Sequence, residues 1–207
     1  MAPPAPVLTT EDVVAAALSG GWVAAGVGPI APLQPAGERA LDAIEAGSMA
    51  GMSWMSPERI ESAADPGRRY PWARSVLALA WPYRPAGTLT ALAAGDVLPD
   101  PSGTPNASGT PRPRGRMASY TCLEGDPGPE GKGRPEDYHE VMGRACDELL
   151  SYLRTRAPGL RAKRFIDHGW ALDRALAESA GIGFCGKNTT LITVAAGSYV
   201  LLAELLL

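Results

Sequence analysis

The chain has few cysteines, and their spacing excludes several kinds of protein. Three occur in 207 residues, at Cys122, Cys146 and Cys185, and no two are separated as C-x-x-C. That pattern argues against a disulfide framework and against a self-contained zinc or iron–sulfur site, so we expect no metal ligands in this chain. A reducing, cytoplasmic setting is the expectation that follows.

The chain also lacks long apolar runs and an excess of positive charge. No apolar run approaches the length of a membrane span, and the N-terminus has no basic region followed by an apolar stretch. The net charge is −3, with a pI near 5.5. Basic residues cluster locally at 112–116 and at Arg161, Lys163 and Arg164, but such runs are more often solvated than bound to nucleic acid. We expect no membrane partner.

What the sequence does contain is an alternation of helical and extended patterns. We expect helices at Thr10–Leu18, Pro35–Ala46, Pro57–Asp65, Asp137–Arg154 and near 171–180, and strands at Trp22–Val27, Ser75–Trp81, Lys163–Asp167 and Thr190–Val194. Tyr199–Leu207 is a strand or a helix. The alternation predicts an α/β fold with a mostly central sheet in one domain of residues 1–207. Met52, Trp54 and Met55 are interpreted as core filling.

Two segments do not fit a continuous core. Residues from about 86 to 135 are rich in Gly, Pro, Ser and Thr and have no apolar periodicity, which is typical of a lid or a disordered insertion. Met117–Cys122 is the one stretch within it that we expect to be ordered. The final residues, through Leu207, would leave an uncovered apolar patch, so the chain is interpreted as truncated.

A glycine-rich turn, Gly181–Lys187, matches G-x-G-x-x-G and most of the phosphate-binding pattern G-x-x-x-x-G-K-[ST]. Both patterns require a strand before the glycines and a helix after them, because the helix N-terminus supplies the N–H groups that hold phosphate. Here the expected order is helix, then strand, and Asn188 replaces the Ser or Thr. The turn therefore indicates a helix end, with Gly181 or Gly183 in the left-handed conformation.

Asp167 is the carboxylate that follows an apolar strand. By itself it is most simply a cap for a helix beginning near Ala171. Alternatively it is a general acid, and burial against Phe165, Ile166 and Trp170 would then raise its pKa toward neutrality. His168 is adjacent and either tunes or replaces this acid or makes a structural hydrogen bond.

Several short stretches, taken in order, carry a resemblance to a known family. They are Gly51–Met55, Ala64–Pro66 with Pro71–Ser75, Asp137–His139, Asp167–Gly169, and the block from Asp173 through Gly181 to Gly197–Tyr199 and Ala203–Glu204. Together they span most of residues 20–85 and 135–207. In this respect the chain resembles the N-terminal, cobalamin-binding portion of epoxyqueuosine reductase.

The resemblance implies a nitroreductase- or cobalamin-reductase-like α/β domain with a mixed central sheet flanked by helices. It implies cobalamin-dependent reduction of epoxyqueuosine to queuosine in the anticodon of tRNA, with base-off cobalamin and with electrons from [4Fe–4S] clusters in a following segment. Asp167 would protonate the epoxide oxygen, which is otherwise a poor leaving group. The same resemblance places further residues near the corrin: Tyr120, Arg174, Lys187, Asn188, Leu191 and Val194.

The chain departs from the family at identifiable positions. Ala63 and Met117 stand where the family has basic residues, and Gly169–Trp170 stand where it commonly has Pro. The cluster cysteines and the helical tRNA-binding region lie outside this sequence. We therefore expect no turnover by the chain alone without an electron donor. A corrinoid-binding or corrinoid-handling module without epoxide chemistry is the alternative, and a flavin or nicotinamide reductase ranks last.

Overall fold

The computed structural model describes residues 8–83, 120 and 136–207. The chain divides into two compact units, Met1–Pro82 with Tyr138–Leu207, and Tyr83–Asp137. The predicted insertion at about 86–135, the basic cluster at 112–116 and the Met117–Cys122 segment lie outside the described residues, except for Tyr120. The following description concerns the first unit.

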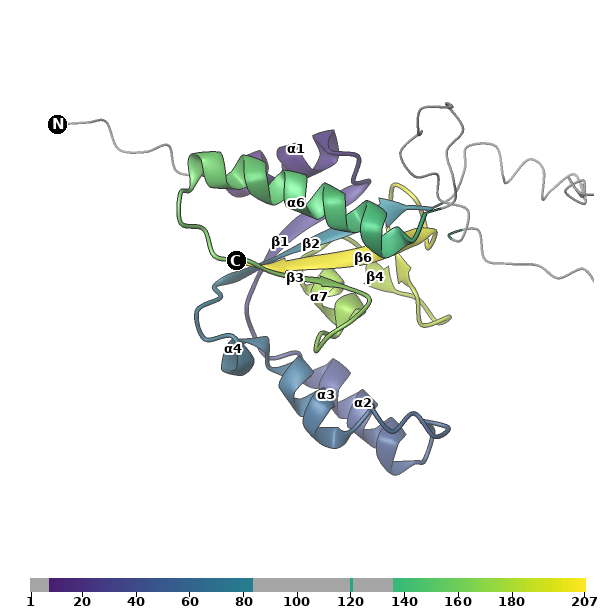
Figure 1. Cartoon of the computed structure of the whole chain (residues 1–207). Coiled ribbons are helices and arrows are strands. Elements are labelled where there is room, and N and C mark those ends of the chain that lie inside the picture. The colour runs from purple at the N-terminus through teal and green to yellow at the C-terminus, as the bar shows by residue number, and fades with distance from the viewer. Residues whose placement is uncertain (1–7, 84–119, 121–135) are drawn as a thin grey trace, which may run out of the picture. The chain divides into compact units, whose positions relative to one another are not determined.

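A four-stranded sheet in the order β1-β2-β6-β3 forms the centre of this unit (Figure 1). The strands are β1 (Ala24–Pro29), β2 (Ser75–Pro82), β6 (Val200–Leu206) and β3 (Lys163–Ile166). Every pairing in this sheet is antiparallel. The expected α/β architecture with a central sheet is confirmed, but the sheet is antiparallel throughout rather than mixed.

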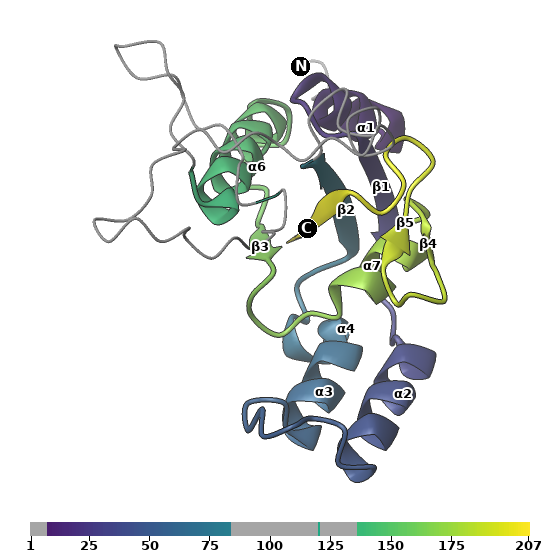
Figure 2. The ribbon, with the colours of Figure 1, turned by 90° about the vertical axis from the view of Figure 1, so that its right-hand side faces the viewer.

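Helices cover both faces of the sheet because β2 is apolar on both sides. Leu77 and Leu79 pack with α1 (Thr10–Ser19) and α6 (Tyr138–Arg156). The alternate residues Ala78 and Ala80 pack against α7 (Asp173–Ser179) on the opposite face (Figures 1 and 2). Successive side chains of a strand point to opposite faces, so one strand supplies both layers of the core.

The expected helices near the N-terminus are confirmed, with their capping residues. In α1, the Thr9 hydroxyl accepts from the Asp12 N–H, and the Asp12 carboxylate accepts from the Thr9 N–H, a complete capping box. Next come α2 (Gln34–Glu45), α3 (Pro57–Ala64) and the short α4 (Pro66–Arg69). Proline at the first position and the Ser56 side-chain cap define the start of α3.

The prediction that Met52 and Trp54 fill the core is wrong. Trp54 is 60% exposed and Met52 is 37% exposed. Both lie in the turn between α2 and α3, where Gly47, Ala50 and Gly51 adopt positive φ angles. The chain reverses direction there, and the turn carries these side chains away from the sheet.

The expectation of an uncovered apolar C-terminus is also wrong. The last residues form β6, which lies inside the sheet between β2 and β3. Leu205 and Leu206 are almost completely buried, because each face of β6 is covered by a helical layer.

The glycine-rich turn ends a helix, as predicted. Gly181 has φ +75° and donates to the Glu178 carbonyl, while Ile182 donates to the Ala177 carbonyl, the two bonds of a Schellman motif. A short hairpin of β4 (Phe184–Cys185) and β5 (Leu191–Ile192) follows instead of a helix. None of the helices in the described ranges is both long and apolar enough to cross a membrane.

Candidate active site

Asp167 directly follows β3 and has an unusual backbone conformation. Its φ angle is +48°, in the left-handed region that residues other than glycine seldom occupy. The Tyr138 hydroxyl, at the first residue of α6, donates to Asp167 Oδ2 at 2.5 Å. Because strained backbone conformations persist only where the surroundings impose them, the aspartate has a defined position at the end of the strand.

Two expectations about Asp167 are wrong. The N-cap of α7 is Leu172 and makes no side-chain hydrogen bond, so Asp167 does not cap this helix. Asp167 is exposed rather than buried, although Phe165 and Ile166 immediately before it lie in the core. The left-handed turn at Asp167 directs its carboxylate out of the sheet, where a ligand can reach it.

His168 makes a structural contact, one of the two roles expected for it. Its Nδ1 lies against the Ile166 carbonyl oxygen. The His139 ring lies 5.7 Å from the His168 ring in an edge arrangement and stacks on Tyr138 at 4.0 Å. The N-terminal turn of α6 and the end of β3 therefore bring two histidines and a tyrosine beside Asp167.

Residues 167–172, here called the acid loop, are held by side chains of α3 and α4. Arg59 Nη2 donates to the Gly169 carbonyl at 2.5 Å, and the Arg69 guanidinium lies 3.9 Å from the centre of the Trp170 ring. Gly169 has φ +100°, and a Cβ there would lie 2.8 Å from the Phe165 ring. These contacts give the acid loop its position against the sheet edge.

Glu204 and Asp173 form a pair of carboxyl groups beneath the acid loop. Glu204 is completely buried on β6, and neither of its carboxyl oxygens has a hydrogen-bond partner in the structure. Burial, and then the nearby Asp173 and Asp167 carboxylates, raise the pKa of Glu204 well above its usual range. Burial also raises the pKa of Asp173. Two ionised carboxylates can only accept hydrogen bonds, so they cannot bond to each other. When Glu204 is protonated, its O–H group can donate a hydrogen bond to Asp173.

These acids are not arranged to hold a metal. Within the described part of the chain, no group of three or more His, Cys, Asp or Glu side chains has the geometry of a metal site.

The turn at 186–190 is attached to α7. Arg174 Nη1 donates to the Thr189 carbonyl, and the Asn188 side-chain oxygen accepts from the Thr190 N–H at 3.3 Å. Lys187 is exposed on the same turn. Arg174 follows the acid loop by two residues, so the structure brings Arg174, Lys187 and Asn188 into one region next to it.

The remaining predicted site residues have different surroundings. The Leu191 side chain is buried in the core, so β5 offers a ligand only its backbone at this position. Val194 is fully exposed. Tyr120 is 36% exposed and packs edge-on against Tyr83, 6.0 Å away, within the second unit. Its place near the corrin remains a prediction.

The sequence patterns did not single out some of the side chains at this site. Tyr138 is not among the predicted site residues, and its contact with Asp167 joins residues 29 positions apart. Arg59 and Arg69 reach the acid loop from helices distant in sequence. Glu204 had a usable signal, because it is a lone charged residue in an apolar strand.

Proteins similar to this chain in sequence and in fold include several epoxyqueuosine reductases. No protein-family model matches the chain. The curated epoxyqueuosine reductase of Synechococcus sp. (strain RCC307) is 31% identical over 197 residues, covering 92% of this chain and 49% of that protein. Epoxyqueuosine reductase crystallised with an epoxyqueuosine-modified tRNA-Tyr stem loop is 28% identical, with a TM-score of 0.67 over 94% of this chain and 44% of that chain.

The Bacillus subtilis epoxyqueuosine reductase, in a structure with its catalytic aspartate loop swung out of the active site, is 26% identical. Its TM-score is 0.67, and the match covers 95% of this chain and 44% of that one. Where a relative aligns with most of this chain, the aligned part is about half of that relative's own length. By both sequence and fold, and over nearly its whole length, the chain is a homologue of epoxyqueuosine reductases.

Proposed function

We propose that this chain forms the cobalamin-binding and epoxide-protonating part of an epoxyqueuosine reductase that acts on tRNA. The observation that supports the proposal most directly is the position of Asp167, exposed at the end of β3 and hydrogen-bonded to Tyr138. The matched relatives are about twice as long, so electron delivery is assigned to an iron–sulfur segment or a separate donor outside this sequence.

Residues in and beside the β4–β5 hairpin would contact the corrinoid. Phe184 is 58% exposed and Val194 is fully exposed, so apolar side chains are available to contact a macrocycle. The rim of cobalamin is a ring of amides, which suits the backbone groups of Leu191 and the polar side chains of Lys187 and Asn188. Arg174, which donates to the Thr189 carbonyl of the same turn, would complete the set within the first unit. Base-off cobalamin, when bound, would supply reducing electrons at cobalt.

The task of the protein's own residues is to supply and control a proton. An epoxide oxygen that leaves as an alkoxide is strongly basic, so proton transfer from a positioned acid lowers the barrier to C–O cleavage. Asp167 in its acid form would give its proton to that oxygen. Tyr138 would hold the carboxyl group in place, because its hydroxyl already contacts Asp167 Oδ2.

The acid loop is also suited to open and close. It is connected to the rest of the unit by discrete contacts, chiefly Arg59 with Gly169 and Arg69 with Trp170, rather than by ladder hydrogen bonds. The Bacillus subtilis relative has been captured with its catalytic aspartate loop swung out of the active site. We assign the same movement to residues 167–172. The thiols of Cys146 and Cys185 are free, which is compatible with a reducing cytoplasm.

The test is single-turnover reduction of epoxyqueuosine-containing tRNA by the chain, supplied with cobalamin and a chemical reductant. Asp167→Asn should lower the rate by about 10²- to 10⁴-fold, the usual contribution of general acid catalysis. Tyr138→Phe should lower it by about 10-fold, through loss of one hydrogen bond. Asp42→Asn, which removes an exposed carboxylate of α2, is the matched control and should leave the rate unchanged.

An Asp167→Asn variant as fast as the parent would refute the role of Asp167. Tight cobalamin binding without conversion of the tRNA would instead favour a corrinoid-handling module.

A further inference from the structure

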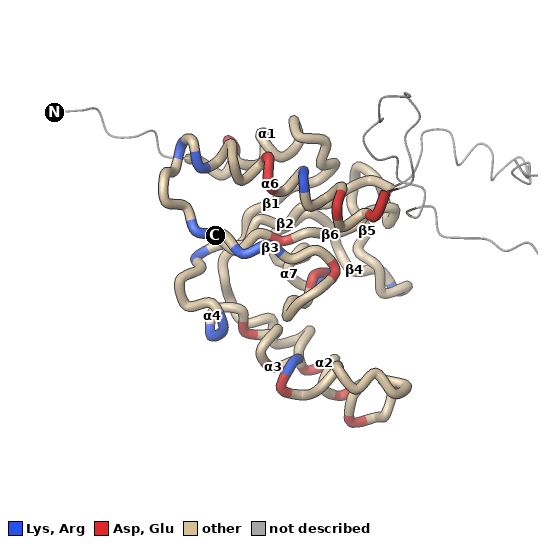
Figure 3. The backbone as a smooth tube through the Cα atoms, in the orientation of Figure 1, with Lys and Arg blue, Asp and Glu red and all other residues tan. Residues whose placement is uncertain are grey.

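Four exposed cations lie along one side of the first unit without a carboxylate to neutralise them. They are Arg69, Arg74, Arg161 and Lys163. None has an ion-pair partner among the described residues, although the chain as a whole has a net charge of −3. Figure 3 shows Lys and Arg gathered on the side where β6 ends, from the end of α6 to α4, and most Asp and Glu elsewhere.

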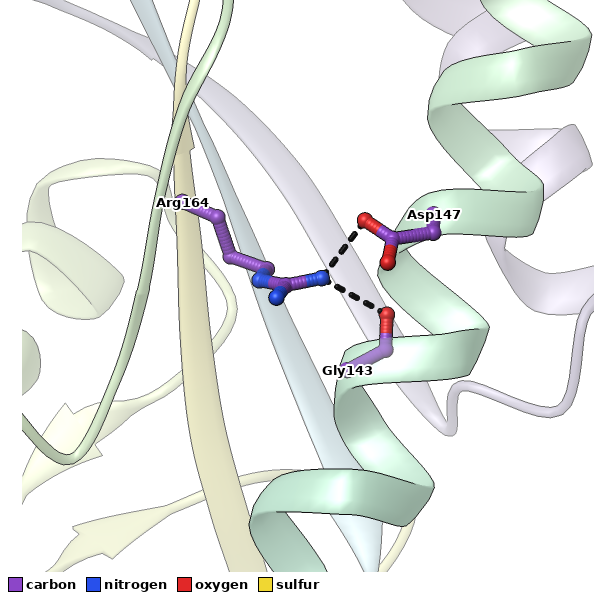
Figure 4. A network of polar contacts seen from close by, with 3 residues as sticks. All are labelled: Gly143, Asp147 and Arg164. Atoms are coloured by element: carbon purple, nitrogen blue, oxygen red, sulfur yellow. Dashed lines mark hydrogen bonds and ion pairs between the residues drawn. The ribbon is translucent and has the colours of Figure 1, made fainter.

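Other nearby cations have structural partners. Arg164, from the same basic run, donates to the Gly143 carbonyl at 2.8 Å and to Asp147 at 2.5 Å, which ties β3 to α6 (Figure 4). Arg154 and Arg156 lie in the last turn of α6, where positive charge is favoured by the helix dipole. Arg69 also lies in the last turn of a helix, the four-residue α4, together with the exposed Arg68, whereas Arg74, Arg161 and Lys163 lie outside helices.

Aromatic rings join three of these cations into a continuous strip. Arg161 lies over Trp72 at 4.6 Å, Arg69 over Trp170 at 3.9 Å, and Lys163 near Phe165 at 5.7 Å. Tyr70 connects the rings, with its centroid 6.3 Å from Trp72 and 5.9 Å from Phe165. Arg74 is next to this group and donates to the Pro71 carbonyl. These residues are called the basic–aromatic strip.

Stacking on a ring fixes a guanidinium without neutralising it. The planar group covers the aromatic face and leaves N–H groups at its edge for other partners. Arg69 uses two of these positions to donate to the Tyr70 hydroxyl and to Ser62 Oγ, and its remaining N–H groups can contact a phosphate. Unpaired like charges held close together repel one another, and an anion bound along them would relieve that repulsion. A row of fixed, unpaired cations among aromatic rings is typical of surfaces that follow a nucleic-acid backbone.

The strip ends at the acid loop. Arg69 contacts Trp170, which is three residues beyond Asp167, so a polyanion lying along the strip reaches the candidate catalytic acid. We infer that the basic–aromatic strip binds the phosphate backbone of the RNA substrate and leads the reacting nucleotide to the acid loop. This inference rests on the proposed function, because that function supplies RNA as the polyanion.

The test measures RNA binding alone, without cofactor or reductant. A fluorescently labelled RNA stem loop is titrated with the chain at several salt concentrations, and fluorescence anisotropy gives the dissociation constant. Arg74→Gln, Arg161→Gln and Lys163→Gln should each weaken binding and make the slope of log affinity against log salt shallower by about 0.7 to 0.9. Arg39→Gln, an exposed cation of α2 outside the strip, should leave affinity and slope unchanged.

A second variant separates stacking from charge. Trp72→Leu keeps every cation but removes the ring under Arg161, so it should weaken binding while leaving the salt slope as it is. Absence of RNA binding by the parent chain, or an equal effect of Arg39→Gln, would overturn the inference. The binding assay does not measure catalysis, so its outcome is independent of the Asp167 assay. A chain that fails to bind RNA would not change the interpretation of the Asp167→Asn rate, and an unchanged Asp167→Asn rate would not change the interpretation of the RNA affinities.

Discussion

Glu204 is a carboxyl group at the centre of an apolar sheet, and its protonation links the stability of the fold to pH. Burial raises its pKa well above the ordinary value of 4.5 that applies in the unfolded chain. The folded protein therefore holds a proton that the unfolded protein releases. Stability from this group is complete below about pH 4.5 and is lost as the pH rises through the folded pKa.

Glu204→Gln should remove that pH dependence. The amide keeps the shape and can still donate to Asp173, but it does not titrate. Between about pH 5 and neutrality, the free energy of unfolding of the parent should fall relative to the variant by up to about 1.4 kcal/mol per pH unit. Urea unfolding across this range measures the difference. Glu140→Gln, on the first turn of α6, is the control, and its free energy of unfolding should vary with pH as that of the parent does. If the parent and Glu204→Gln instead show the same dependence of unfolding free energy on pH, burial does not hold the proton on Glu204.

At the level of single residues, the sequence indicated the candidate acid but not its surroundings. Asp167 was identifiable because it follows an apolar strand. Its exposure depends on one left-handed φ angle, and its partner Tyr138 is distant in sequence, so neither can be read from local patterns. Glu204 is visible as an isolated acid, but its pairing with Asp173 requires the register of β6 beneath α7.

At the level of elements, the position of α7 depends on glycine in β1. A Cβ on Gly26 would collide with the Ala180 carbonyl oxygen and with Ile182, at the end of α7. The helix can therefore approach the strand backbone only where side chains are missing (Figure 2). Since α7 follows the acid loop and carries Arg174, this contact also positions the candidate site.

Gly26→Ala should destabilise the chain by about 1 to 3 kcal/mol, because the backbone carbonyl cannot move aside as a flexible side chain would. Gly143→Ala is the matched control. Its added Cβ meets nothing closer than 3.8 Å, and alanine in place of glycine inside α6 should stabilise the helix by about 1 kcal/mol. Chemical denaturation of both variants measures these changes, and equal stability of Gly26→Ala and the parent would contradict the close packing.

Elements with strong local signals were predictable, and those defined by tertiary contacts were not. The capping box of α1 and the Ser56–Pro57 start of α3 are encoded within a few residues. In contrast, β1 begins at Ala24 rather than Trp22, because pairing with β2 determines its ends. The expected strand at Thr190–Val194 is reduced to Leu191–Ile192, since its partner β4 has only two residues.

At the level of the whole molecule, the fold is shared with the epoxyqueuosine reductases, and two positions where the sequence departs from that family have clear surroundings. Ala63, where the family has a basic residue, is only 3% exposed and packs in the core, so the chain offers no cation at that position. Trp170, where Pro is common, provides the ring that Arg69 covers. One of the contacts that hold the acid loop therefore involves a position where this chain departs from the family pattern.

Titration of the purified chain with cob(II)alamin under anaerobic conditions, followed by visible and EPR spectroscopy, tests the proposed function most directly. The proposal predicts tight binding with a base-off spectrum, weakened in Arg174→Ala, whose side chain attaches the 186–190 turn to α7. Asp42→Asn should bind as the parent does. No binding, or a base-on spectrum unaffected by Arg174→Ala, would contradict the assignment of this unit as a cobalamin site.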